Sequence, residues 1–226
     1  MPKEICLEGV CTSGKTTLGK KLVTKEIIYI PEYSQIDTGG KRRNELTFPP
    51  ADISSALSSV DYLLILDQQR KELLNHRDVP TVLTDRGIVA LLAFEYAMFS
   101  RGNIGILVES SKKIKRHLEL HKSGLPVGWV YTRFSNLDDF ESRASIRKYG
   151  LPFLLERETA KYLQEYYDQF LFLLGNDRYL IVEATGDING NVTKAKQFII
   201  NSFNMSSINK DRLVDTITRT NTSLLK

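Results

Sequence analysis

Short runs of β-branched and aromatic residues alternate along the chain with longer stretches in which apolar residues recur every three or four positions. The short runs predict five strands, which lie at Glu4 to Leu7, Ile27 to Ile30, Thr81 to Thr84, Gly128 to Phe134, and Tyr179 to Ala184. Strands that alternate with helices are typical of an α/β protein in which helices cover both faces of a parallel sheet. The pattern therefore predicts an α/β fold.

Two of the longer stretches have the spacing of amphipathic helices. One begins after the helix breaker Pro49-Pro50 and places apolar residues on one face, at Ile53, Leu57, Val60 and Leu64. The other covers residues 154–174 and is rich in Tyr and Phe. The aromatic residues between 162 and 172 recur at helical spacing and Trp129 lies in a strand, so we expect all of them to pack in the core.

The chain shows no internal repeat, and it predicts one domain over residues 1–203 followed by a C-terminal helix or tail over 204–226. The tail is rich in Ser, Thr and Asn but still carries Ile208, Leu213, Val214 and Ile217, which favours a terminal helix with a frayed end. The polar, turn-rich segment 34–50 predicts a loop over a site.

A glycine-rich motif follows the first predicted strand directly. The run Gly9-Val10-Cys11-Thr12-Ser13-Gly14-Lys15-Thr16 matches G-x-x-x-x-G-K-[ST] at every position, and Leu18 and Leu22 indicate a helix after it. Glycines let the backbone curl so that its N–H groups and the positive end of the helix face phosphate oxygens. In such a cradle Lys15 adds a positive charge and the Thr16 hydroxyl holds Mg²⁺. The alternative is an ordinary glycine turn between strand and helix.

The motif at residues 9–16 is that of a P-loop, which occurs in kinases, GTPases and motor ATPases alike. A GTPase also has a D-x-x-G switch motif and an N-K-x-D motif that binds guanine. Residues 37–40 fit the first pattern but come only 22 residues after Lys15, and residues 209–212 fail the second because the aspartate comes one position early. The sequence disfavours a GTPase.

Charged residues stand at the ends of two other predicted strands, where the carboxyl ends of a parallel sheet face a bound ligand. Asp85 and Arg86 end the third strand. Asp85 can bind Mg²⁺ directly or through water, and Arg86 can hold an acceptor or the transferred phosphoryl group. A surface ion pair that caps the next helix is the alternative. Glu32 ends the second strand and could accept a proton from an acceptor hydroxyl or fix a sugar. A solvated loop glutamate is its alternative.

Two arginines past the fourth strand predict a lid over residues 135–150. Arg143 and Arg147 are four positions apart, which places them on one face of a helix. Such a pair can close on phosphates, neutralise developing charge and exclude water. A solvated helix with internal ion pairs is the alternative.

These motifs, taken in order, make the chain resemble the thymidylate kinase and deoxynucleoside kinase branch of the P-loop kinases. The resemblance spans most of residues 4–200 and rests on residues 5–9, 14–17, 31–32, 82–86 and 181–188 together with the lid arginines. It implies a P-loop NTPase fold with a five-stranded parallel sheet and a helical lid. It also implies ATP with Mg²⁺ as donor, a nucleoside or nucleoside monophosphate as acceptor, and adenine near the turn from Ala184 to Asp187.

Carried over residue by residue, the resemblance implies three sets of site residues. The catalytic set is Lys15, Asp85, Arg86, Glu32, Arg143 and Arg147, in which Glu32 resembles the base of deoxynucleoside kinases. The nucleotide-binding set is Gly9, Cys11, Thr12, Ser13, Gly14, Lys15, Thr16, Thr17, Ala184 and Gly186. The Mg²⁺ ligands are Thr16 and Asp85.

The chain departs from both families at two positions. It has Cys11 where thymidylate kinases usually carry an acidic residue, and Gly87 where an aromatic commonly follows their Asp-Arg pair. Deoxynucleoside kinases usually show Glu-Arg-Ser at that point. The acceptor therefore stays open between nucleoside and nucleotide. A kinase for another small acceptor and a non-catalytic nucleotide-binding module stay open as well.

Composition narrows the possible partners. The chain of 226 residues has 31 Lys and Arg against 27 Asp and Glu, a net charge of +4, which is weak for a nucleic-acid partner. The two cysteines provide neither a disulfide framework nor a four-ligand metal site. His117 and His121 lie in a basic segment without a third metal ligand, so we expect a solvated helix face there. The absence of a long apolar run predicts a cytoplasmic protein with no membrane partner, and a homodimer is possible.

Overall fold

Five parallel strands form a sheet in the order β2-β3-β1-β4-β5. The computed structural model describes residues 2–33, 49–75, 78–120, 125–147 and 151–226. The strands are β1 Lys3–Gly9, β2 Ile27–Ile30, β3 Thr81–Asp85, β4 Gly128–Arg133 and β5 Tyr179–Glu183. The predicted strands and their parallel arrangement are confirmed, because each predicted end lies within two residues of the observed one.

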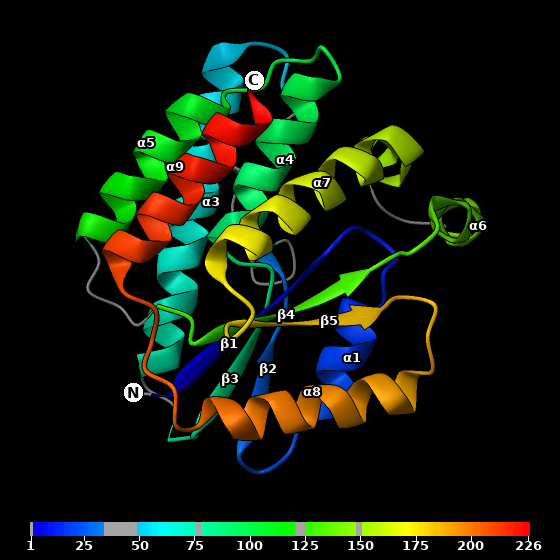
Figure 1. Ribbon diagram of the computed structural model, residues 1–226. Helices are drawn as coiled ribbons and strands as arrows, with labels where there is room; N and C mark the ends of the chain where they lie inside the picture. Colours follow the sequence, from blue (N-terminus) through cyan, green and yellow to red (C-terminus); the bar gives the residue numbers. More distant parts are fainter. Residues whose placement is uncertain (1, 34–48, 76–77, 121–124, 148–150) are drawn as a thin grey trace.

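Helices cover both faces of this sheet, as the alternation of strands and helices predicts (Figure 1). One face carries α1 Lys15–Leu22 and α8 Ile188–Ser202. The other carries α3 Ile53–Asn75, α4 Ile88–Ser100, α5 Leu107–Leu120, α7 Arg157–Leu174 and α9 Lys210–Leu224. The short helix α6 Leu137–Ser145 stands beyond the carboxyl end of β4.

Residues of β1 alternate between the two faces and thereby separate two apolar cores. Ile5 and Leu7 pack with Leu18 of α1 and Ile199 of α8. Cys6 joins the larger core on the opposite face, which is built from α3, α4, α5, α7 and α9. Most of the aromatic residues expected in the core are there: Trp129, Tyr166, Tyr167 and Phe170 are buried, and Tyr162 is partly buried. The prediction is wrong for Phe172, which is 73% exposed because it lies on the outer face of α7.

Two helix predictions need correction. Ile53 is 61% exposed, so only the later positions of the predicted face pack against the core, because Ile53 is the first residue of α3. The helix predicted over 154–174 is divided: a 3₁₀ turn covers Pro152–Leu155, and α7 begins at Arg157. Glu156 between them has an extended backbone and forms an ion pair with Arg101.

The C-terminal helix α9 packs against α5 and α7. Its residues Leu213 and Ile217 are buried in the same apolar cluster as Tyr166 of α7. The helix continues to Leu224, so the tail is helical almost to its end. None of the described helices is both long enough and apolar enough to cross a membrane.

Replacing Leu213 by Ala tests the docking of α9. Leu213 is fully buried, so Leu213→Ala should lower the free energy of unfolding by about 2–5 kcal/mol through lost apolar burial and the cavity left behind. Leu225→Ala is the control at the end of the same helix, where the side chain is 39% exposed, and it should cost under about 0.5 kcal/mol. Chemical denaturation measures both; equal losses would contradict a docked α9.

Candidate active site

The glycine-rich loop curls between β1 and α1. Gly9 has φ 139° and Gly14 has φ 91°, both in the region that favours glycine. A Cβ on Gly9 would lie 2.3 Å from the carbonyl oxygen of Thr132, so any side chain there would collide with β4. Thr12 also has a positive φ of 63°, a strained conformation for a non-glycine residue that costs on the order of 1 kcal/mol. The sequence motif thus forms the curled turn that its glycines predict.

Hydroxyl groups tie this loop to the neighbouring strand β4. Ser13 Oγ donates to the carbonyl oxygen of Val10 at 2.9 Å and lies 2.6 Å from Thr132 Oγ1. Thr132 Oγ1 in turn donates to the carbonyl oxygen of Glu8 at 3.1 Å. The loop therefore keeps its shape through contacts with a rigid strand.

Lys15 lies inside the curl and is only 6% exposed. Its Nζ donates to the carbonyl oxygens of Gly9 at 2.9 Å and Val10 at 2.8 Å. Burial, together with repulsion from Arg86, lowers the pKa of Lys15 to about 8. A buried ammonium whose hydrogen-bond acceptors are neutral carbonyls is well suited to gain an anionic partner, and a polyphosphate would supply one.

Thr16 and Asp85 meet as predicted for a Mg²⁺ site. Thr16 Oγ1 donates to Asp85 Oδ2 at 2.8 Å, and the Tyr29 hydroxyl donates to the same oxygen at 2.6 Å. Asp85 is buried, and its Oδ1 has no hydrogen-bond partner among the described residues. A hydroxyl oxygen beside an unpartnered carboxylate oxygen fits the oxygen ligands that Mg²⁺ prefers. Tyr29 could not be found from the sequence alone, because its contact with Asp85 depends on the pairing of β2 with β3.

Arg86 links the acidic end of β2 to the glycine-rich loop. Its Nε donates to Glu32 Oε2 at 3.1 Å, and its second guanidinium nitrogen lies 3.6 Å from Cys11 Sγ. The side chain of Glu32 is 31% exposed and that of Arg86 is 16% exposed. Glu32 is therefore held over the site by an ion pair and does not extend into bulk solvent.

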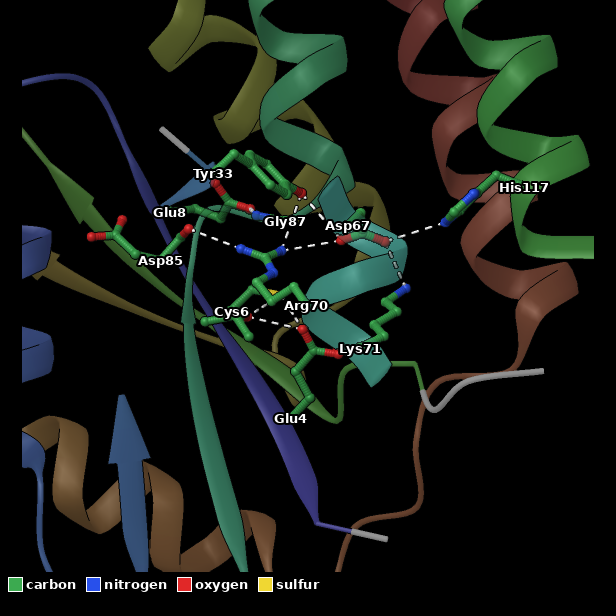
Figure 2. Close-up of polar contacts among 11 residues, drawn as sticks. Glu4, Cys6, Glu8, Tyr33, Asp67, Arg70, Lys71, Asp85, Gly87 and His117 are labelled. Carbon is green, nitrogen blue, oxygen red and sulfur yellow. Dashed lines mark hydrogen bonds and ion pairs between the residues drawn. The ribbon is translucent and has the colours of Figure 1, made fainter. Parts of the chain in front are cut away.

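The turn that carries Asp85 and Arg86 is supported from the face of the sheet that packs against α3, as Figure 2 shows. The Arg86 N–H donates to the carbonyl oxygen of Leu7 at 2.9 Å, and the Gly87 N–H donates to Glu8 Oε1 at 2.8 Å. Arg70 of α3 is fully buried and donates to the carbonyl oxygen of Asp85 at 3.2 Å. Each of the three residues of the turn, 85–87, is thus held by a different partner.

A buried ionic cluster around Asp67 keeps Arg70 in place (Figure 2). Asp67 forms ion pairs with Arg70 and Lys71, each at 3.1 Å, and lies 3.3 Å from His117 Nε2. Burial alone would raise the pKa of Asp67, but Lys71, His117 and Arg70 outweigh it and hold the pKa well below its usual range. The solvated face predicted for His117 is wrong, because α5 turns this side chain onto Asp67 of α3; His121 lies outside the described residues.

Arg143 brings α6, the helix predicted to act as a lid, into contact with the glycine-rich loop. It donates to the carbonyl oxygen of Thr12 at 3.2 Å and lies over the Phe134 ring at 5.6 Å. Arg157 of α7 pairs with Asp138 and Glu141 and so anchors α6 from the other side.

The spacing predicted that Arg143 and Arg147 share one face of a helix, and this prediction is wrong. The helix α6 ends at Ser145, because the N–H groups of Ile146 and Arg147 both return to the carbonyl oxygen of Ala144 and close the last turn. Arg147 is exposed beyond that end. The remainder of the predicted lid, residues 148–150, and most of the predicted loop over the site, residues 34–48, lie outside the described residues.

The turn expected near adenine follows β5, two strands from the glycine-rich loop. The Ala184 N–H donates to the carbonyl oxygen of Arg133 at 2.7 Å, and Asp187 caps α8 by accepting from the N–H groups of Asn189 and Gly190. Ala184 is buried, whereas Gly186 is exposed, as is Thr17 on α1. Adenine binding at this turn stays a prediction.

No family model matches the sequence, and no curated protein sequence matches it. Solved structures do share the fold. A deoxyadenosine kinase from M. mycoides with bound dATP is similar at 15% identity and TM-score 0.62, over 87% of this chain and 99% of that one. The same kinase with the products dCMP and a flexible dCDP is similar at 16% identity and TM-score 0.64, over 87% of this chain and 98% of that one. The thymidylate kinase from Candida albicans is similar at 21% identity and TM-score 0.65, over 92% of this chain and 95% of that one. The predicted α/β fold, a five-stranded parallel sheet with helices on both faces, is confirmed, and these solved structures share it.

Proton uptake on nucleotide binding tests the state of Lys15. The phosphates of a nucleotide are almost fully ionised at pH 8, while a lysine with a pKa of about 8 is half deprotonated. An anionic partner raises that pKa, so binding should take up roughly half a proton per site at pH 8 and almost none from Lys15 at pH 6. Calorimetry of MgADP binding in buffers of different ionisation enthalpy measures the uptake. Lys20 is exposed, so Lys20→Met serves as the control and should leave the proton uptake unchanged. Equal proton uptake at pH 6 and pH 8 would contradict a pKa of about 8 for Lys15.

Proposed function

We propose that this chain is an ATP-dependent kinase that transfers the γ-phosphoryl group to a nucleoside or a nucleoside monophosphate. The observation that carries the proposal is the convergence of Lys15, Thr16, Asp85, Arg86 and Glu32 at the carboxyl ends of three adjacent strands. The solved neighbours support it, since one holds dATP, another holds the products dCMP and dCDP, and the third is a thymidylate kinase.

Each side chain takes a role that its contacts suit. The loop amides and Lys15 bind the donor, and Arg143 adds positive charge above the loop. Thr16 and Asp85 hold Mg²⁺, which when bound neutralises phosphate charge and orients the phosphates. Arg86 and Glu32 form the acceptor side of the site. No covalent enzyme intermediate is needed, because phosphoryl transfer proceeds by positioning and electrostatic stabilisation.

The pairing of Glu32 with Arg86 favours a hydroxyl acceptor over a phosphate acceptor. A hydroxyl must lose a proton as it attacks, and a carboxylate at the acceptor side can take that proton. A monophosphate brings further negative charge to a place where Glu32 already neutralises Arg86. A nucleoside is therefore the acceptor that this geometry supports best, with a monophosphate second.

A survey of acceptors tests the proposed function. ADP release from MgATP should rise at least tenfold when the correct nucleoside is present and less with its monophosphate. Stimulation by another small hydroxyl compound alone would assign a different kinase, and nucleotide binding with no acceptor effect would favour a non-catalytic module. Lys15→Met should lower the stimulated rate by about 100-fold or more through lost charge stabilisation. The matched control Lys20→Met lies on the exposed face of α1 and should keep the rate.

Replacing Glu32 by Gln tests its role as base. The amide keeps the shape of the side chain but cannot take a proton, so Glu32→Gln should lower kcat by about 10²–10⁴-fold and change the KM for MgATP little. Glu26→Gln is the control, since Glu26 is exposed just before β2. Steady-state kinetics with a nucleoside measures both variants. An unchanged kcat in Glu32→Gln would remove Glu32 from the mechanism.

Binding of ATP with Mg²⁺ belongs to this proposal, as does the assignment of site residues. A cytoplasmic location, a homodimer and the absence of a nucleic-acid or membrane partner stay predictions of the sequence.

A further inference from the structure

Glu8 is a buried carboxylate directly before the glycine-rich loop, and both of its oxygens have partners. Oε1 accepts the Gly87 N–H at 2.8 Å, and Oε2 accepts the Tyr167 hydroxyl at 3.0 Å. Only 1% of the residue is exposed, so neither oxygen is free to reach a ligand. The side chain joins β1 to the turn after β3 and to α7, as Figure 2 shows for its approach to Gly87.

The turn that Glu8 contacts has an unusual backbone at Arg86. Arg86 has φ 64°, a left-handed conformation that is strained for a residue with a side chain. The β1–β3 ladder ends there, since Leu7 pairs with Asp85 and its carbonyl oxygen accepts the Arg86 N–H. The next N–H, that of Gly87, turns away from the ladder and is satisfied by the Glu8 side chain. A left-handed residue persists only where its surroundings fix it, and here Glu8 fixes the residue that follows.

The surroundings of Glu8 leave little room for another arrangement. A Cβ on Gly87 would lie 3.0 Å from Cys6 Sγ and 3.3 Å from Glu8 Oε1, so the backbone approaches the carboxylate closely. Gly87 is also the N-cap residue of α4 and has no side chain to cap that helix. The Glu8 carboxylate therefore occupies the positive end of α4, which favours an acceptor there.

We propose that Glu8 is a positioning residue for Arg86: by accepting the Gly87 N–H, it fixes the left-handed turn that aims the Arg86 guanidinium at Glu32 and Cys11. The inference rests on the proposed kinase function, in which Arg86 acts on the acceptor side. Without a hydrogen-bond acceptor for the Gly87 N–H, the turn relaxes and the Arg86 guanidinium is no longer held toward Glu32 and Cys11. The proposed ATP site on the glycine-rich loop keeps its own contacts.

Three substitutions of Glu8 separate its hydrogen bond from its charge. Glu8→Gln keeps an oxygen for the Gly87 N–H and places an amide that can donate to Tyr167. Glu8→Leu removes the acceptor, and Glu8→Asp keeps the charge but is too short to reach. Glu95 is the matched control: it is a second buried glutamate, on α4, and accepts one backbone N–H, that of Ile106 at 2.9 Å.

Steady-state kinetics with MgATP and the nucleoside should rank these variants. In Glu8→Leu and Glu8→Asp, we expect kcat to fall at least 30-fold while the KM for MgATP stays within threefold of the parent. In Glu8→Gln, we expect kcat to fall less than fivefold. Glu95→Leu should leave kcat within threefold. In an Arg86→Ala background, Glu8→Asp should have less than a twofold further effect, because Glu8 acts through Arg86. A full 30-fold loss in that background would overturn the proposal, and Glu8→Asp carries the test if Glu8→Leu does not fold.

A readout without turnover keeps this inference separate from the proposed function. In protein labelled with ¹⁵N-arginine, the Nε–H signal of Arg86 is identified by its loss in Arg86→Ala. Its exchange with water should speed up at least tenfold in Glu8→Asp, and remain at the parental rate in Glu8→Gln and Glu95→Leu. Unchanged exchange in Glu8→Asp refutes the positioning role whether or not the chain is a kinase. Faster exchange in a protein without acceptor-stimulated turnover would support the positioning role and reject only the function.

Discussion

The parallel pairing of β1 with β3 brings together the glycine-rich loop and the acidic turn, the two parts of the site on which the rest is built. Its register places Leu7 opposite Asp85, so the strand that leads into the glycine-rich loop ends beside the strand that carries the acidic turn. Because β2 joins the other edge of β3 in the same direction, Glu32 and Tyr29 reach the same end of the sheet. A shift of one residue in the β1–β3 pairing would separate Thr16 from Asp85, and a shift in the β2–β3 pairing would separate Tyr29 from Asp85.

Burying so much charge requires that each charge be matched. Removing a carboxylate or an ammonium from water costs several kcal/mol even after relaxation, and a partner recovers that cost only with good geometry. Asp67 is matched by Arg70 and Lys71, and Arg70 in turn holds the turn after β3 by donating to the carbonyl oxygen of Asp85. Such a cluster contributes little net stability compared with apolar packing. Its consequence here is to fix one arrangement of the turn behind the site.

The sequence predicted the parts of this structure that depend on local chemistry. Glycines, the motif lysine and strand composition act over a few residues, so the loop and the five strands could be anticipated from the printed sequence. Thr16 and Asp85 are 69 residues apart, and their meeting could be anticipated only because the carboxyl ends of parallel strands face the same ligand. Glu8 and Arg70 could not, because their roles arise from contacts across 79 and 15 residues of sequence that depend on register and helix packing. The available signal for Glu8 was a pair of glutamates, Glu4 and Glu8, which point to the same face of a strand that is buried on both faces. His117 was misplaced for the same reason, since its partner Asp67 is 50 residues away.

The cations over the glycine-rich loop are bonded to the loop itself. Lys15 donates to the carbonyl oxygens of Gly9 and Val10, and Arg143 donates to that of Thr12. These bonds join a charged donor to a neutral acceptor, whereas bonds to a phosphate would join opposite charges and add direct charge attraction in a poorly solvated place. The desolvation that lowers the pKa of Lys15 is already present in the fold before any ligand arrives. An incoming polyphosphate would therefore replace weaker bonds with stronger ones at positions that the fold has already desolvated, and this exchange is the physical basis on which the loop favours an anion over water.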